Sequence, residues 1–208
     1  WLLDPAGIQV TNTPGGLSGP THTQNANVNN VTASDVLGAL TAGTNVTIQT
    51  TAAFPLSNRD IVVDAALPLL STNPDVTLSL LSAGGIVINQ QIGGVDAPLG
   101  FNMTATSGSI DVSNTGSILA KTMYAAASGS ITLAGNVKAQ GGTMFLQSNQ
   151  DIIFTGGTVQ AQGGTMYLQS NRDIIFAGGT VQSPVLDLRA GAKIYSNAAG
   201  TVVTGGSL

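Results

Sequence analysis

The stretch KAQGGTMFLQSNQDIIFTGGTV at residues 138–159 is followed directly by QAQGGTMYLQSNRDIIFAGGTV at residues 160–181. The two blocks, each 22 residues long, differ at only four positions. A repeat of this length predicts one supersecondary unit stacked on its copy, so that neighbouring units bury each other's apolar face. We therefore expect a β-solenoid, and a structural or binding role before a catalytic one.

The repeat extends in both directions as short alternating strands that are separated by Gly pairs or Ser-Asn. The four methionines of the chain follow one another at separations of 20, 21 and 22 residues. Because side chains alternate across a strand, we expect them to point inward at equivalent places of successive coils. This predicted inward column consists of Met103, Met123, Met144 and Met166, continued by Leu78 and Leu186.

Two further inward columns follow from the same alternation. The second strand of each unit contributes Ile86, Ile110, Ile131, Ile152 and Ile174. The segment that closes the coil contributes Ile92, Ile118, Val137, Val159 and Val181. Three inward columns per turn predict a three-sided parallel β-helix, an all-β fold with about seven or eight coils of 20–22 residues over residues 45–208.

Residues 1–44 differ in pattern and are expected to form a separate N-terminal part. Within them, residues 11–30 are polar and rich in Gly, Pro and Asn, which predicts an excursion or a binding loop. This loop holds His22, the single histidine. A metal site needs several convergent ligands, and no such cluster accompanies His22 in the sequence.

One short helix is expected near residues 34–42. In TASDVLGALTAG, residues 32–43, Val36 and Leu40 lie at helical spacing, and Ser34 is placed to cap the first turn.

Composition favours β structure and argues against several classes of protein. Only 8% of the residues are charged, the net charge is −4, and the basic residues are scattered, so a nucleic-acid partner is not expected. Cysteine is absent, which excludes disulfides and thiolate metal sites. No apolar run is long enough for a membrane-spanning helix. Low charge predicts a surface that is partly covered by other copies, and the start at Trp1 suggests a processed product or a piece of a longer chain.

Catalytic, metal and cofactor sites are not expected. Asp151 and Asp173 recur on successive coils, with Asp60 in the same Ser-Asn-x-Asp-Ile motif, and paired carboxylates are typical of polysaccharide-degrading enzymes. We interpret them instead as corner residues that hydrogen-bond local backbone, because duplication copies them. The same motif stacks Asn149 on Asn171, which predicts a side-chain amide ladder.

The outward positions carry the candidate interface. Tyr124, Phe145 and Tyr167 are expected to form an exposed aromatic ladder on three consecutive coils, and Ile153 and Ile175 point outward on the next face. Three interpretations stay open: lateral packing against another protein, intrinsic stacking that stabilises the sheet, and glycan binding.

Two segments carry a family resemblance. WLLDP at residues 1–5 and VLGALTAGTNVTIQT at residues 36–50 resemble a recurrent module of the filamentous-haemagglutinin-type exoproteins, over roughly residues 1–67. The resemblance implies a right-handed parallel β-helix and a Gram-negative bacterial source. It also implies export by a partner outer-membrane transporter, extracellular placement, and a role in adhesion or surface fibres. It carries over no catalytic residues.

The leading hypothesis is a structural segment of a secreted bacterial fibre, sheath or adhesin. Strand edges at the ends of a stack invite further strands, and neither end of the sequence shows an obvious cap. Head-to-tail association into a filament, or continuation in a longer solenoid, is therefore predicted beside lateral packing. The alternatives are a carbohydrate-binding adhesin segment that contacts glycans or a host cell surface through the aromatic ladder, and a β-helical polysaccharide-degrading enzyme.

Overall fold

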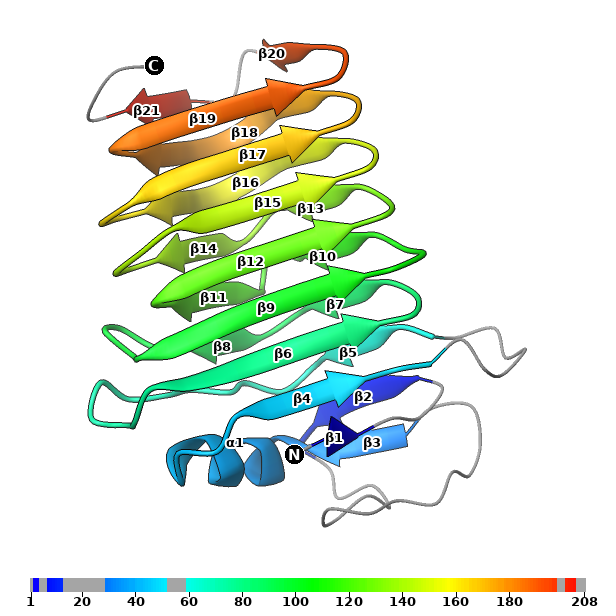
Figure 1. Ribbon diagram of the computed structural model, residues 1–208, viewed down its shortest axis with the longest axis vertical. Coiled ribbons are helices and arrows are strands. Elements are labelled where there is room, and N and C mark those ends of the chain that lie inside the picture. Colours follow the sequence, from blue (N-terminus) through cyan, green and yellow to red (C-terminus); the bar gives the residue numbers. More distant parts are fainter. Residues whose placement is uncertain (1, 4–6, 13–28, 52–58, 198–200, 205–208) are drawn as a thin grey trace.

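The computed structural model describes residues 2–3, 7–12, 29–51, 59–197 and 201–204. The chain forms a parallel β-solenoid of about seven turns with one short helix, as expected (Figure 1). In Figure 1 the front strands run to the right and the back strands return to the left while the chain climbs from N to C. The coil is therefore right-handed.

The first face of the solenoid, at the front of Figure 1, is an eight-stranded parallel sheet. Six of its strands alternate between buried and more exposed residues, which is the pattern of a sheet with one face on the core. In spatial order they are β1 (Leu2–Leu3), β4 (Val46–Gln49), β6 (Val76–Ser82), β9 (Leu99–Ala105), β12 (Thr122–Ala127), β15 (Met144–Ser148), β17 (Thr165–Ser170) and β19 (Val185–Ala190).

The other two faces join into one sheet. The second face consists of β3 (Asn29–Thr32), β2 (Ile8–Thr11), β5 (Ile61–Val63), β7 (Ile86–Ile88), β10 (Ile110–Val112), β13 (Ile131–Leu133) and β20 (Ile194–Ser196). The third face consists of β8 (Gln91–Gly93), β11 (Ser117–Ala120), β14 (Asn136–Ala139) and β21 (Thr201–Thr204). Two long strands span both faces, namely β16 (Ile152–Ala161) and β18 (Ile174–Ser183).

Glycine makes the bend inside the two long strands. The pairing of β16 with β18 shifts register around Thr155, where the second face turns into the third. Gly157 and Gly179 have φ angles of 61° and 73° there, and a Cβ on Gly179 would lie 2.5 Å from the carbonyl oxygen of Gly156. Only glycine fits that conformation and that spacing, so these Gly pairs are coil corners, as predicted.

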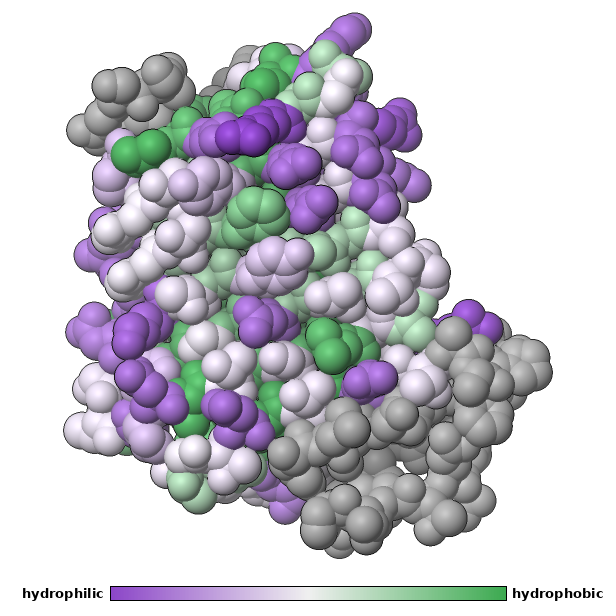
Figure 2. Space-filling view, viewed as in Figure 1, coloured by the Kyte–Doolittle hydropathy of each residue, from purple (hydrophilic) through white to green (hydrophobic). Residues whose placement is uncertain are grey.

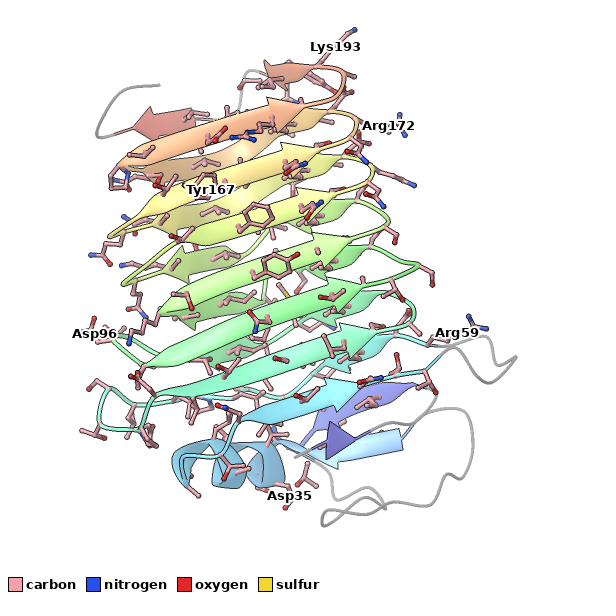
Figure 3. The ribbon with its side chains drawn as sticks, in the orientation of Figure 1. Asp35, Arg59, Asp96, Tyr167, Arg172 and Lys193 are labelled. Carbon is pink, nitrogen blue, oxygen red and sulfur yellow. The ribbon has the colours of Figure 1, made fainter. Side chains whose placement is uncertain are left out.

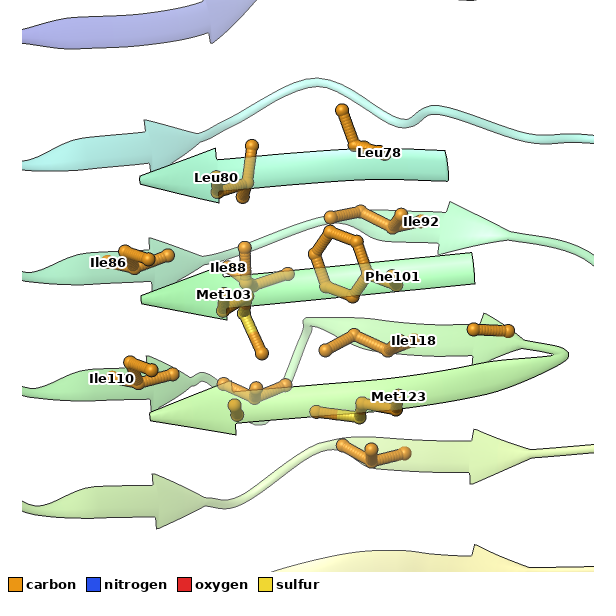
Figure 4. Packing of buried hydrophobic residues seen from close by; sticks show 14 of the residues in the cluster. Leu78, Leu80, Ile86, Ile88, Ile92, Phe101, Met103, Ile110, Ile118 and Met123 are labelled. Atoms are coloured by element: carbon orange, nitrogen blue, oxygen red, sulfur yellow. The ribbon is translucent and has the colours of Figure 1, made fainter. Parts of the chain in front are cut away.

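The predicted methionine column is wrong at one coil. Met123 pairs with Phe101, whereas Met103 pairs with Ala125 in the neighbouring column. Figure 4 shows Phe101, not Met103, between Leu78 and Met123. Both Phe101 and Met103 are fully buried, because a slip of two residues leaves every side chain on its own face. Alternation alone therefore cannot detect the error.

The remaining inward columns are confirmed. Ile86, Ile110, Ile131, Ile152 and Ile174 stand in register on the second face. Ile92, Ile118, Val137, Val159 and Val181 stand in register on the third face. Beside the isoleucine column, the buried rings of Phe154 and Phe176 stack with centroids 5.1 Å apart. These columns form one continuous apolar core along the solenoid axis.

The expected division between residues 44 and 45 is not a break in the stack. β1 pairs with β4 and β2 pairs with β5, so the strands before residue 45 belong to the same two sheets. β3 adds to the other edge of β2, so the chain returns to the N-terminal end of the stack before it enters the helix.

Helix α1 (Ala33–Thr41) covers this N-terminal end (Figure 1). Its N-cap is Thr32, whose Oγ1 accepts the N–H of Asp35 at 3.2 Å, rather than the expected Ser34. Val36 and Leu40 are fully buried against the core. The expectation that neither end is capped is therefore wrong for this end, because the helix shields apolar side chains that a further coil would otherwise cover.

Candidate functional site

The outward side of the first face is uncharged from β4 to β17. Its outward residues are Thr, Ser, Gln, Asn, Ala, Leu and the aromatic residues, with one Gly. Charge enters only on β19, where Asp187 and Arg189 point outward. In Figure 2, the deepest hydrophilic colour on this face lies over β19. An uncharged sheet face of this extent is unusual for a protein surface in water and is the first candidate for contacts.

The aromatic ladder lies in the middle of this face. Tyr124 pairs with Phe145, and Phe145 pairs with Tyr167, on three consecutive coils as predicted. The first two rings are parallel within 4° with centroids 5.4 Å apart, whereas the ring of Tyr167 is tilted 44° from Phe145 at 6.1 Å. Tyr124 and Phe145 therefore stack on each other, whereas Phe145 and Tyr167 do not lie parallel.

The second candidate column lies on the neighbouring face. Ile153 and Ile175 pair in register and are half-buried, and Tyr195 follows them on the last coil with 44% of its surface exposed. Towards the N-terminus the same column holds Thr132 and Asp111. These two residues interrupt the apolar column, which resumes with Val87, and the strands of the second face are mostly shorter than those of the first.

The recurring aspartates hold successive coils together at one corner. Oδ1 of Asp151 accepts the N–H of Asp173 at 3.1 Å, and Oδ1 of Asp173 accepts the N–H of Lys193 at 2.9 Å. One coil earlier, the hydroxyl of Ser130 accepts the N–H of Asp151 at 3.4 Å. Arg172 approaches Asp151 with Nε and Oδ1 3.7 Å apart. The carboxylates thus bond backbone as expected, but across coils rather than within one.

Two amide ladders run along the corners and faces of the best-preserved repeat. The predicted one joins Nδ2 of Asn171 to Oδ1 of Asn149 at 3.2 Å. In the second, which was not predicted from the sequence, Nε2 of Gln160 donates to Oε1 of Gln182 at 3.2 Å. The spacing in the sequence could have predicted this pair, because the two glutamines are 22 residues apart and occupy the same position of adjacent coils.

Three shallow depressions follow one another along the first face. The one near the C-terminal end has a volume of about 190 Å³ and is lined by Phe145, Tyr167, Leu168, Gln169, Asp187 and Arg189. The next, about 290 Å³, is lined by Thr104, Thr106, Ala126, Gln147 and Asn149 among others. The third, about 380 Å³, shares Thr104 and Thr106 with it and extends to Gln49 and Leu81. We call this series the axial trough.

An ion pair closes the C-terminal end of the axial trough. Nη2 of Arg189 donates to Oδ2 of Asp187 at 2.9 Å, and its Nε donates to Oδ1 at 3.2 Å. These hydrogen bonds lower the pKa of Asp187 below its usual value and raise the pKa of Arg189. The side chain of Asp187 is 31% exposed and that of Arg189 is 70% exposed, and both line the depression. In Figure 3, Tyr167 marks this region of the sheet.

Several residues singled out from the sequence lie outside the described residues, namely His22 with the segment 13–28, Trp1, Asp4 and Pro5 of the opening motif, and Ser57 and Asn58 of the Ser-Asn-x-Asp-Ile motif that contains Asp60. Among the described residues, no group of three or more His, Cys, Asp or Glu is arranged to hold a metal ion. No helix in the described part of the chain is long and apolar enough to cross a membrane.

No protein-family model matches the chain, and neither a curated protein nor a solved structure matches it. The function is therefore inferred from the surface described above.

Proposed function

We propose that the chain is a structural segment of an extracellular bacterial surface fibre or adhesin, in which copies pack side by side through the first face. The observation that carries this proposal is the uncharged outward surface from β4 to β17. Burial of an uncharged sheet face against another molecule has a low desolvation cost, because no charged group has to be removed from water.

The repeating coil gives such an interface a regular pattern. The two near-identical blocks keep all of their buried residues and most of their outward ones: Gln147 lies on Gln169, and the change from Phe145 to Tyr167 keeps an aromatic ring. A core needs only the inward positions, so the preserved outward pattern supports a surface that meets a partner at every step.

Helix α1 favours side-by-side over head-to-tail association. Val36 and Leu40 occupy the space that the core of a further coil would need at the N-terminal end. A copy stacked there would have to displace the helix. The resemblance of residues 1–67 to the filamentous-haemagglutinin-type exoproteins supports the extracellular, adhesive setting.

Sedimentation velocity over a range of concentrations, combined with negative-stain electron microscopy, tests this proposal. We expect the wild-type chain to form lateral assemblies, and Ala126→Lys to reduce them because it places a charge in the middle of the first face. Thr132→Lys is the matched control, since Thr132 points outward on the second face of the same coil.

Two results would contradict the proposal. Monodisperse wild-type monomers at high concentration would exclude lateral assembly through any face. Loss of assembly in Thr132→Lys alone would instead place the interface on the second face, beside Ile153 and Ile175.

A further inference from the structure

We propose that the axial trough binds a neutral oligosaccharide, and that Tyr167, Gln169 and Asp187 form the subsite for one of its sugar rings. This binding does not depend on the packing of copies side by side. It would, however, give the proposed adhesin segment a chemical class of target.

The subsite combines an apolar ring with polar groups at its rim. Because Tyr167 is tilted 44° from Phe145, its ring is not covered by a parallel neighbour on that side. The depression beside it measures about 190 Å³, below the roughly 300–1,000 Å³ of sites for drug-sized ligands, so it suits a single ring. A pyranose presents apolar C–H groups on its face and hydroxyls around its rim, which matches this arrangement.

The polar groups of the subsite supply both kinds of hydrogen bond. The carboxylate of Asp187 accepts from sugar hydroxyls, and the amide of Gln169 both donates and accepts. Arg189 fixes the Asp187 carboxylate through two hydrogen bonds, and Arg189 keeps further N–H groups that can donate to a ligand.

The charge of the subsite favours a neutral sugar over a uronate. The guanidinium of Arg189 is already paired with Asp187 at 2.9 Å, so the two charges offset each other. The outward residues from β4 to β17 contain no other cation that a sugar carboxylate could meet. An anionic ligand would therefore lose hydration without gaining an ion pair.

The course of the trough predicts the orientation of the ligand. Gln147 and Gln169 pair in register and connect the subsite to the adjoining depression, which in turn shares Thr104 and Thr106 with the third. Successive coils lie about 4.8 Å apart along the axis, close to the length of one hexose unit in an extended chain. An oligosaccharide parallel to the axis would thus place one unit on each coil, and affinity should rise with its length.

The aromatic ladder itself provides a matched control. Tyr124 belongs to the same column as Tyr167, but its ring stacks on Phe145 and does not line any of the three depressions. If the ladder only stabilised the sheet, replacement of either tyrosine would change the affinity for a sugar to the same extent. A sugar subsite at the end of the trough would make only Tyr167 matter for binding.

Isothermal titration calorimetry with cellohexaose, mannohexaose and laminarihexaose, their disaccharides, and hexagalacturonate tests the inference. We expect at least one neutral hexasaccharide to bind more tightly than its disaccharide and than hexagalacturonate. Tyr167→Ala and Asp187→Asn should each weaken this binding about tenfold or more, and Tyr124→Ala should leave it within about twofold. Circular dichroism establishes that each variant is folded. If Tyr167→Ala does not fold, the isosteric Asp187→Asn still tests the contribution of the subsite to binding.

The outcomes separate this inference from the proposed function. Absence of binding by all three neutral hexasaccharides, tighter binding of hexagalacturonate, or equal losses in Tyr124→Ala and Tyr167→Ala would each overturn it. Binding by a chain that stays monomeric in sedimentation would contradict lateral packing and leave the sugar site standing. If both hold, the hexasaccharide should reduce lateral assembly, because the same face is used.

Discussion

At the scale of single residues, the hydroxyl of Ser130 and the carboxylate of Asp151 accept the same kind of hydrogen bond one coil apart. Each oxygen receives the backbone N–H at the equivalent corner of the following coil, from Asp151 and Asp173 respectively. Ser109 does the same for Ser130 at 3.2 Å. In these coils the corner therefore uses a side-chain acceptor of short reach, and a negative charge is not needed for that hydrogen bond.

This equivalence predicts different effects for two substitutions of one residue. Asp151→Ser should change the free energy of unfolding by no more than about 0.5 kcal/mol, because serine supplies the acceptor in the two preceding coils and the ion pair with Arg172 is long, at 3.7 Å, and exposed on the Arg172 side. Asp151→Ala should cost about 1 kcal/mol, because the N–H of Asp173 loses its side-chain partner. Urea unfolding measures both, and equal losses would contradict this account.

At the scale of elements, helix α1 turns an open end of the solenoid into a covered one. Its apolar side consists of Ala33, Val36 and Leu40, all buried, and Gly43 follows its end with a φ of 81° that leads the chain back to β4. The helix does not extend either sheet, and it covers the end of the core through side-chain packing. Stability at this end should therefore depend on the local features that hold the helix in place.

The N-cap offers a direct test of that dependence. Thr32→Ala removes the acceptor for the N–H of Asp35 and should destabilise the chain by about 1 kcal/mol. Ser34→Ala, two residues along, should stay within about 0.5 kcal/mol, because Ser34 is exposed and is not the cap. Thermal unfolding, monitored by circular dichroism, compares the two variants. A larger destabilisation by Ser34→Ala would show that Ser34, not Thr32, is the N-cap.

At the scale of the whole molecule, the coil is the unit of construction. The last strand of the near-identical repeat, β18, pairs with its copy β16 on one side and with β20 and β21 on the other. Most contacts of each coil are with its two neighbours, so removal of one complete coil brings together surfaces that already fit.

Deletion of residues 160–181 should therefore give a folded, shorter solenoid, in which Met144 comes to lie against Leu186 as Met166 now does. Deletion of residues 160–180 leaves one extra residue in the coil, which would turn inward side chains outward until a loop absorbs it. Far-ultraviolet circular dichroism and gel filtration distinguish the two. Equal folding of both deletions would show that register is set by the corners alone.

The alternation of apolar residues was sufficient to predict the three faces, the inward columns and the outward position of the aromatic ladder. It could not place Phe101 and Met103 correctly, because both are apolar, both point inward and they lie two residues apart. It also could not show the axial trough. That surface is assembled from several strands, and the residues that line it are ordinary Thr, Gln and Ala until the coils stand side by side.

The sequence by itself determined the repeating coil and its core, because burial selects side chains at a period of two along the chain and about 22 between coils. The tertiary structure alone decided where the predicted helix lies on the stack and which residues surround Tyr167. A nine-residue helix and a strand that returns to the N-terminal edge cover that end, and the ring of Tyr167 and the paired Asp187 and Arg189, from neighbouring coils, line the depression. Both depend on contacts between residues distant in the chain, which no local pattern contains.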